Sequence, residues 1–159
     1  MKYFVQLLLV LAICTACNQK DKHPHLTPAQ RAARVDSLKG VLLQTDIAFS
    51  QLCEQKGRNA AFAEYADSGA TLLRAYSEPV LGKESILNVM NAHTDTGFVI
   101  TWIPIKSDVA GSGDLGYTYG SYIIENHNSD KAGGTYCTIW KRGKDGKWKF
   151  ALSTGNEGI

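Results

Sequence analysis

The chain has 159 residues, of which 44% are hydrophobic and 20% are charged, and its formal net charge is +2. This length fits one domain, and this composition excludes wholesale disorder, a collagen-like chain and a polytopic membrane protein. The small net charge, without a stripe of Lys and Arg, gives no reason to expect a nucleic-acid partner. Four cysteines, two of them in the first 17 residues, do not make a disulfide scaffold.

Residues 1–16 have the pattern of an export signal. Lys2 is followed by a mainly apolar run to Ala16. This run is shorter than the roughly 20 residues of a membrane span, but it suits the apolar core of a signal peptide, which has about 7–15 residues. Small residues then precede Cys17, which resembles the lipobox of bacterial lipoproteins. The resemblance implies that Cys17 is acylated, and a plain secretory signal cut near Ala16 is the alternative.

This pattern divides the chain into a lipoprotein signal peptide (1–16), a tether (17–27) and a folded domain (28–159). It predicts a protein anchored to a membrane of the bacterial cell envelope, on its periplasmic or its surface side. His23 and His25 lie in the tether, but no further ligand residue is near them in the sequence, so we expect no metal site there. We expect no cofactor either.

Three helices are expected in the first half of the domain. Thr27, Pro28 and Gln30 form a typical helix start with a capping box, and Gly57 is a suitable end. A short second helix is expected to begin with Asn59 as its cap and to continue through Tyr65, and a third is expected from Lys83 to His93. The apolar face of the first helix follows from helical spacing and comprises Val35, Leu38, Leu42, Thr45, Phe49 and Leu52.

The second half of the domain has the pattern of a β-meander. Strand-like runs cover residues 98–109, 115–126, 134–142 and 148–154, with turn signals between them, and a shorter run covers 70–76. Helices followed by long strands predict an α+β fold with helices on one face of an antiparallel sheet. Gly116 and Gly120 interrupt one strand and predict bends or bulges there. Trp140 and Trp148 flank a turn symmetrically, so we expect them to pair across the hairpin.

This order of elements resembles the SnoaL-like and ketosteroid-isomerase-like superfamily, the cone fold that nuclear-transport-factor-like proteins also adopt. The segments 65–71 and 82–86 resemble its helix boundaries. The ordered set of motifs at 102–104, 113–120, 134–136, 140–142 and 145–149 is similar to a branch of unknown function. The resemblance covers about residues 36–157. It implies a curved antiparallel sheet wrapping a long N-terminal helix, with three helices and a pocket at the open end (a cystatin-like or SnoaL-like cone).

The resemblance also implies where ketosteroid isomerases keep an Asp base and an oxyanion-binding Tyr. Those positions hold Arg74 and Ser50 in this chain. An Arg stays protonated and is no base, so isomerase chemistry of that kind is not expected and we assign no catalytic residue. His93 and Asp95 are expected in a solvent-facing turn, and His127 in an exposed hairpin loop. Cys53 and Cys137 either form a disulfide or stay as two buried thiols.

The remaining candidate site is the pocket of the cone. Because side chains alternate between the faces of a strand, Tyr117, Tyr119 and Tyr122 cannot all point inward without a bulge. An apolar cavity with a few hydroxyl groups suits a small amphipathic ligand, although the same aromatic residues also suit a filled core or a dimer contact. The expected lining residues are Trp102, Tyr119, Tyr122, Tyr136, Thr138 and Ser153.

Three functions from different classes remain open, because one fold can host all of them. The first is a lipid-anchored protein that holds a small organic molecule in the cone. The second is an isomerase- or dehydratase-type enzyme with a rearranged acid–base set. The third is a protein-docking module, with a homodimer through the sheet face as one form. We favour the first.

Overall fold

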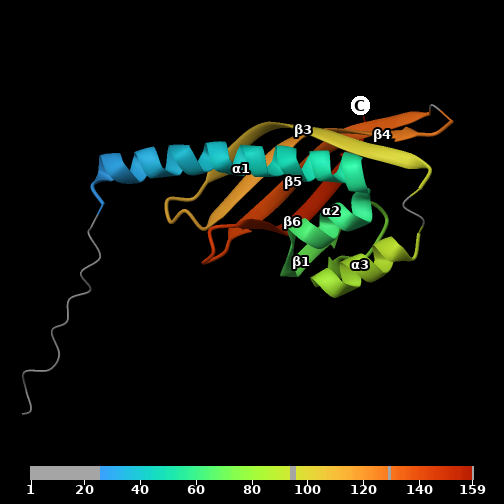
Figure 1. Cartoon of the computed structure of the whole chain (residues 1–159), viewed down its shortest axis with the longest axis horizontal. Helices are drawn as coiled ribbons and strands as arrows, with labels where there is room; N and C mark the ends of the chain where they lie inside the picture. The colour runs from blue at the N-terminus through green and yellow to red at the C-terminus, as the bar shows by residue number, and fades with distance from the viewer. Residues whose placement is uncertain (1–25, 94–95, 129, 159) are drawn as a thin grey trace, which may run out of the picture.

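A computed structural model describes residues 26–93, 96–128 and 130–158 of this chain (Figure 1). The predicted signal peptide, Cys17 and residues 18–25 of the tether lie outside the described residues. Within the described part, no helix is long and apolar enough to cross a membrane. The elements are α1 (Pro28–Lys56), α2 (Arg58–Tyr65), β1 (Ala66–Leu73), β2 (Val80–Leu81), α3 (Lys83–Asn91), β3 (Phe98–Val109), β4 (Leu115–Asn126), β5 (Lys131–Arg142) and β6 (Trp148–Glu157).

Helix α1 begins and ends where the sequence predicts. The Thr27 Oγ1 accepts a hydrogen bond from the Gln30 amide at 3.2 Å, and the Gln30 side chain accepts one from the Thr27 amide at 2.9 Å, which completes the capping box. At the other end, Gly57 has a φ of 85°, a conformation that favours glycine, and its amide donates to the carbonyl of Cys53. Both ends of this long helix are therefore fixed by local chemistry.

Several element boundaries differ from the sequence prediction, and α3 ends at Asn91 rather than at His93. Helix α2 begins at Arg58 after a Gly57 cap, and Asn59 instead donates from its amide to Asn91 Oδ1 at 2.9 Å, which ties α2 to α3. Strand β1 covers 66–73 rather than 70–76, because α2 passes directly into it at Ala66. Strands β5 and β6 extend further than expected, to Lys131 and to Glu157 respectively.

The six strands form one curved sheet in the order β2-β1-β6-β5-β4-β3. The expected meander β3-β4-β5-β6 is antiparallel throughout, but β1 pairs with β6 in parallel, so the sheet is mixed rather than purely antiparallel. Helix α1 lies across β3, while α2 and α3 lie at the β1 side of the sheet (Figure 1). The α+β cone predicted from the sequence is confirmed.

Glycines on β4 allow the sheet to curve around α1. A Cβ at position 120 would overlap the carbonyl oxygen of Ile103, and the β3–β4 register shifts beside it, between Pro104 and Lys106. A Cβ at position 116 would lie 2.6 Å from Leu42 of α1. The predicted irregularity is therefore confirmed at Gly120. At Gly116 the register is regular, and the glycine is needed because Leu42 approaches closely.

The predicted Trp140–Trp148 pair is wrong. The turn at 143–147 pairs Arg142 with Trp148, and the regular register from there sets Trp140 opposite Phe150. Trp140 and Phe150 are both fully buried. The hairpin is thus stabilised by a Trp–Phe pair that packs into the core beneath α1.

Phe49 of α1 is the centre of the aromatic core. Its ring lies 4.8 Å from Tyr65, 4.7 Å from Trp102 and 5.9 Å from Phe150, measured between ring centroids. Aromatic pairs at these distances add roughly 0.5–1.5 kcal/mol each beyond area burial. The core therefore fastens α1 and α2 to the middle of the sheet and leaves the β1–α3 end less filled.

Candidate functional site

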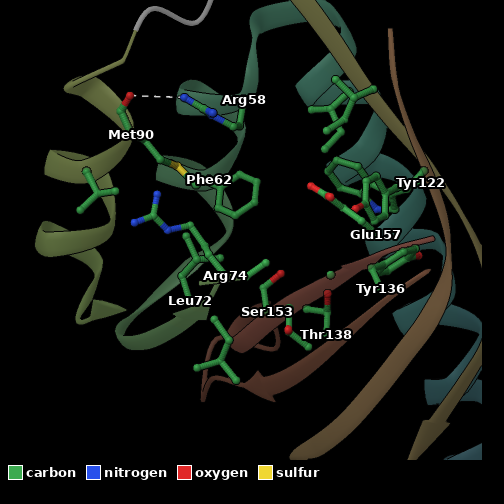
Figure 2. A pocket seen from close by; sticks show the side chains of 18 of the residues that line it. Arg58, Phe62, Leu72, Arg74, Met90, Tyr122, Tyr136, Thr138, Ser153 and Glu157 are labelled. Atoms are coloured by element: carbon green, nitrogen blue, oxygen red, sulfur yellow. Dashed lines mark hydrogen bonds between the residues drawn. The ribbon is translucent and has the colours of Figure 1, made fainter. Parts of the chain in front are cut away.

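A pocket of about 350 Å³ lies between the inner face of the sheet and the three helices. This volume is at the lower end of the range for small-molecule sites. Figure 2 shows its walls, with Phe62 and Met90 on the helix side and Tyr122 and Tyr136 on the sheet side. The lining residues are Phe49, Arg58, Phe62, Leu72, Leu73, Arg74, Ala75, Val89, Met90, His93, Ile100, Trp102, Tyr122, Ile124, Tyr136, Thr138, Ser153, Thr154, Gly155 and Glu157.

Five of the six expected pocket residues line this cavity, namely Trp102, Tyr122, Tyr136, Thr138 and Ser153. Tyr119 does not, and its prediction is wrong. It is 40% exposed and stacks on Tyr117 with 6.5 Å between ring centroids. The reason is strand alternation, since β4 turns its even-numbered residues inward and its odd-numbered residues outward along this stretch.

A buried carboxylate lies behind the pocket wall. Asp46 of α1 is fully buried, and it accepts hydrogen bonds from Trp102 Nε1 at 2.8 Å and from Tyr136 Oη at 2.7 Å. The Thr118 hydroxyl lies near it and helps to stabilise its charged form. Trp140 Nε1 in turn donates to Thr118 Oγ1 at 2.8 Å. This network fixes the orientation of the Trp102 and Tyr136 rings.

Burial sets the protonation chemistry of this network. Burial raises the pKa of Asp46 above its ordinary value, and the hydrogen bonds from Tyr136 and Trp102 and the nearby Thr118 hydroxyl offset part of that rise. The pKa of Tyr136 is also raised, first by burial and then by the neighbouring Asp46 charge. Tyr136 therefore stays a neutral phenol whose proton is directed at Asp46, and it presents a ring face rather than a donor to the pocket.

Thr138 and Ser153 provide the hydroxyl groups of the pocket floor. The two residues are opposite each other on β5 and β6, and both line the cavity (Figure 2). Within residues 26–93, 96–128 and 130–158, neither hydroxyl has a side-chain hydrogen-bond partner. Thr138 is only 2% exposed, so its hydroxyl has little other access to solvent than through the pocket. Buried polar groups are normally satisfied, so this floor is suited to a ligand or an ordered water.

The charged side chains lie around the opening of the pocket. Arg74 follows the end of β1, Arg58 begins α2, and Glu157 ends β6. His93 also lines the pocket, just after α3, although its side chain is exposed as the sequence predicts. In Figure 2 Arg74 and Glu157 lie on opposite sides of the cavity. The site is therefore apolar inside and charged at its rim.

Other candidates take structural positions. Ser50 accepts a hydrogen bond from the backbone amide of Trp102 at 2.8 Å, so it anchors β3 to α1. Cys53 and Cys137 are not joined by a disulfide. Cys53 of α1 is buried in the core. Cys137 of β5 lies between Tyr136 and Thr138, which face inward, so its side chain is on the other face of the sheet. His127 is exposed, and Asp95 lies outside the described residues.

Asp46 is the residue of this site that the sequence analysis missed. Helical spacing contained the signal, because position 46 follows Leu42 by four residues and lies on the same face of α1. The sequence prediction placed Thr45 on that face instead. A charged residue at a core position of a helix is rare unless it is paired, and this rarity is the signal for Asp46.

The site holds no cluster suited to a metal ion. Among the described residues, no group of three or more His, Cys, Asp or Glu side chains comes together.

Comparisons with known proteins identify the fold. No family model and no curated protein matches the sequence. Among solved structures, a ketosteroid isomerase-like protein from Erwinia carotovora atroseptica has a TM-score of 0.61 at 10% identity, covering 75% of this chain and 95% of its own. An NTF2-like protein with a cystatin-like fold from Novosphingobium aromaticivorans has a TM-score of 0.63 at 13% identity, covering 81% and 88%.

A third solved structure is a protein from Catenulispora acidiphila in complex with S-DNPA. Its TM-score is 0.59 at 12% identity, and the alignment covers 77% of this chain and 94% of that one. At such identities the likeness concerns the fold alone. The chain thus has the cone fold of ketosteroid isomerase-like and NTF2-like proteins, as the sequence resemblance predicts.

Proposed function

We propose that this chain binds a small amphipathic organic molecule in the pocket of the cone, as a lipid-anchored protein of the bacterial cell envelope. The observation that carries the binding proposal is the cavity itself, which has mostly apolar walls and the unpartnered hydroxyl of Thr138 on its floor. Sites for small molecules combine this kind of apolar lining with a few placed polar groups. The complex of the Catenulispora acidiphila protein with S-DNPA is consistent with ligand binding on this fold.

The raised pKa values of the two pocket phenols, Tyr122 and Tyr136, do not suit them to act as bases. Burial raises the pKa values of both Tyr122 and Tyr136. A general base needs a pKa near the working pH, so this direction is opposite to what catalysis by these phenols requires. Arg74 occupies the position of the isomerase base and cannot take up a proton.

The binding proposal is tested with the purified domain. Native mass spectrometry reads whether a molecule copurifies, and the neutral fluorescent probe N-phenyl-1-naphthylamine reads access to the cavity. Ser153→Phe places a ring in the pocket, and Ser121→Phe, the same change on the outer face of β4, is the matched control. We expect probe binding to fall at least about 10-fold in the first variant and to stay unchanged in the second, because a filled cavity excludes the probe.

Thermal unfolding of both variants shows whether each remains folded. Equal probe binding by two folded variants would contradict the proposal. So would a wild-type protein that takes up no probe and carries no molecule.

The anchor has its own test, and its support is the sequence of residues 1–17. Cells that express the full chain are labelled with a radioactive or clickable fatty acid. We expect label on the wild-type protein and none on Cys17→Ser, because acylation requires the thiol. Label that persists on the variant would contradict the lipid anchor.

A homodimer through the outer sheet face is a second candidate function. Large apolar side chains are exposed on the face of β3 and β4 that points away from α1, including Ile103 at 72% exposed, Ile123 at 51%, and the stacked pair Tyr117 and Tyr119. Contiguous exposed apolar surface is typical of interaction sites. Light scattering after size-exclusion chromatography is expected to show a dimer for the wild type and a monomer for Ile123→Lys. A wild-type monomer would contradict this function.

A further inference from the structure

A second hollow adjoins the pocket at its opening, and we call it the vestibule. It has a volume of about 340 Å³ and lies between the end of β1 and the end of β6. Six of its lining residues, including Arg74 and Glu157, also line the pocket. The two hollows therefore border each other at the ends of β1 and β6.

The two hollows differ in chemistry. Deep in the pocket the walls are aromatic and aliphatic, with Phe49, Phe62 and Ile100 among them. The vestibule adds the side chains of Tyr76 and Asn156 to the shared Arg74 and Glu157. A ligand that occupies both hollows therefore has an apolar body and a polar end.

Arg74 is placed to bind that polar end. Its guanidinium donates one hydrogen bond, from Nη2 to Ser77 Oγ at 3.2 Å. Within the described chain it forms no ion pair, so most of its five N–H donors are open to a ligand. A guanidinium fork matches a carboxylate, sulfonate or phosphate group in a bidentate arrangement.

The charges around the opening favour an anion. Two cationic side chains, those of Arg58 and Arg74, line the pocket. Among its described lining residues, Glu157 provides the one carboxylate. Glu157 lies across the cavity from Arg74, on the Tyr122 side (Figure 2). An anionic group that binds Arg74 therefore has the Glu157 carboxylate on the opposite side of the cavity.

Tyr76 forms an edge of the vestibule at an energetic cost. Among the described residues, Tyr76 has a positive φ, 55°, although it is not a glycine. Its side chain is fully exposed and borders the vestibule. A left-handed conformation costs a residue with a Cβ roughly 1–2 kcal/mol. Such strain is found preferentially at ligand-binding sites.

We propose that the vestibule is a head-group subsite in which Arg74 binds an anionic group of a ligand whose apolar body fills the pocket. This inference rests on the proposed binding function and adds the chemical class of the ligand, an amphipathic organic anion. The apolar body gains from burial, and the anionic group gains from the open guanidinium donors of Arg74.

A matched pair of probes separates the two parts of this proposal. N-phenyl-1-naphthylamine is neutral, and 8-anilinonaphthalene-1-sulfonate has the same ring system with one added sulfonate. Fluorescence titrations give the affinity of each for the wild type, for Arg74→Gln and for Arg34→Gln. Arg34 lies on the exposed start of α1, close to Gly113, and lines neither the pocket nor the vestibule, so its variant removes one positive charge elsewhere.

We expect Arg74→Gln to weaken the sulfonate probe about 5- to 10-fold, because a charge-assisted hydrogen bond is lost at a partly exposed site. The neutral probe is expected to change by less than about 2-fold, and Arg34→Gln to change neither. Glu157→Gln is expected to strengthen the sulfonate probe slightly, since it removes the opposing charge. Ser153→Phe should exclude both probes.

Several outcomes would overturn the inference. One is an Arg74→Gln variant that leaves the ratio of the two affinities unchanged. Another is weaker sulfonate binding in Glu157→Gln, which would point to a cationic or zwitterionic head group. A neutral probe that does not bind the wild type contradicts the proposed function itself. A neutral probe that binds normally while charge has no effect contradicts only the head-group subsite.

Discussion

The two halves of the inner sheet face differ in how they are filled. Toward the β5–β6 turn, Trp140 and Phe150 are fully buried and pack beneath α1. Two residues further along β5, on the same face, Thr138 faces an open cavity together with Ser153 of β6. The strands are continuous through both halves. At this level of β5 and β6 the difference lies in side-chain size, because Thr138 and Ser153 are short where Trp140 and Phe150 are large rings.

This contrast shows how one sheet provides both stability and a site. The packed half anchors α1 through Phe49, whose ring contacts both Trp102 and Phe150. The open half is covered by α2 and α3, which are joined through Asn59 and Asn91. The packed half therefore carries much of the folding energy, and the open half is free to be shaped by a ligand.

The largest expected effect is in the packed half. Trp140→Ala removes a fully buried ring and leaves Thr118 without its indole donor, so we expect a loss of about 3–5 kcal/mol in the free energy of unfolding. Thr138→Ala, two residues away, is expected to cost less than about 1 kcal/mol, because its side chain borders a cavity. Urea denaturation of both variants measures the difference. Similar losses for the two would show that the halves are equally packed.

The next largest effect on the free energy of unfolding is expected at Gly120, where β4 closely approaches β3. A Cβ at position 120 would overlap the backbone of Ile103, so Gly120→Ala is expected to cost about 1–3 kcal/mol. Gly40→Ala is the control, because nothing lies within 4 Å of a Cβ at that position on α1. There we expect a gain of about 0.5–1 kcal/mol from helix propensity. A neutral Gly120→Ala would mean that the sheet bends elsewhere.

Asp46 lies between the two halves and makes their stability depend on pH. The pKa of Asp46 in the folded state is raised above the unfolded value of about 3.9. Its contribution to the free energy of unfolding is therefore complete at pH values below about 3.9, and it is lost as the pH rises through the folded-state pKa. We expect the stability of the wild type relative to Asp46→Asn to decline as pH increases from about 4 to 7. Denaturation at several pH values tests this, and a constant or rising difference would contradict the raised pKa.

The smallest effect is expected at the edge of the vestibule. Tyr76→Gly relieves the strain of a positive φ, and the exposed ring contributes nothing to the core. After the entropic cost of glycine is subtracted, we expect a gain of about 0.5–1 kcal/mol in the free energy of unfolding. The same variant should bind the sulfonate probe more weakly if the ring borders the head-group subsite. A less stable variant would show that Tyr76 is not strained.

Much of the fold could be read from the sequence, because local signals specify it. The capping residues and Gly57 bound α1, and strands β3 and β4 begin and end at the predicted residues. Where the prediction was wrong, pairing between segments far apart in the sequence determined the structure. The parallel pairing of β1 with β6 has no local signature, and neither has the direct passage from α2 into β1 at Ala66.

The candidate site was less predictable, because register determines which side chains share a face. The sequence supplied five of the lining residues, but Tyr119 turns outward with the odd positions of β4. On β6 the shift between Phe150 and Leu152 reverses the alternation, so that Ser153 faces the pocket together with Thr138. A bulge of one residue exchanges the faces of all that follows, and no pattern within the strand announces it.

The sequence by itself determined the class of fold, the long capped helix, the four long strands and the glycine at which the sheet bends. Each of these follows from backbone preferences and periodicity over a few residues. Only the tertiary structure decided that Asp46 is enclosed by Trp102, Tyr136 and Thr118, and that Arg74 stands at the opening of a cavity. Both depend on distances between segments far apart in the chain, which are fixed when the sheet closes over α1.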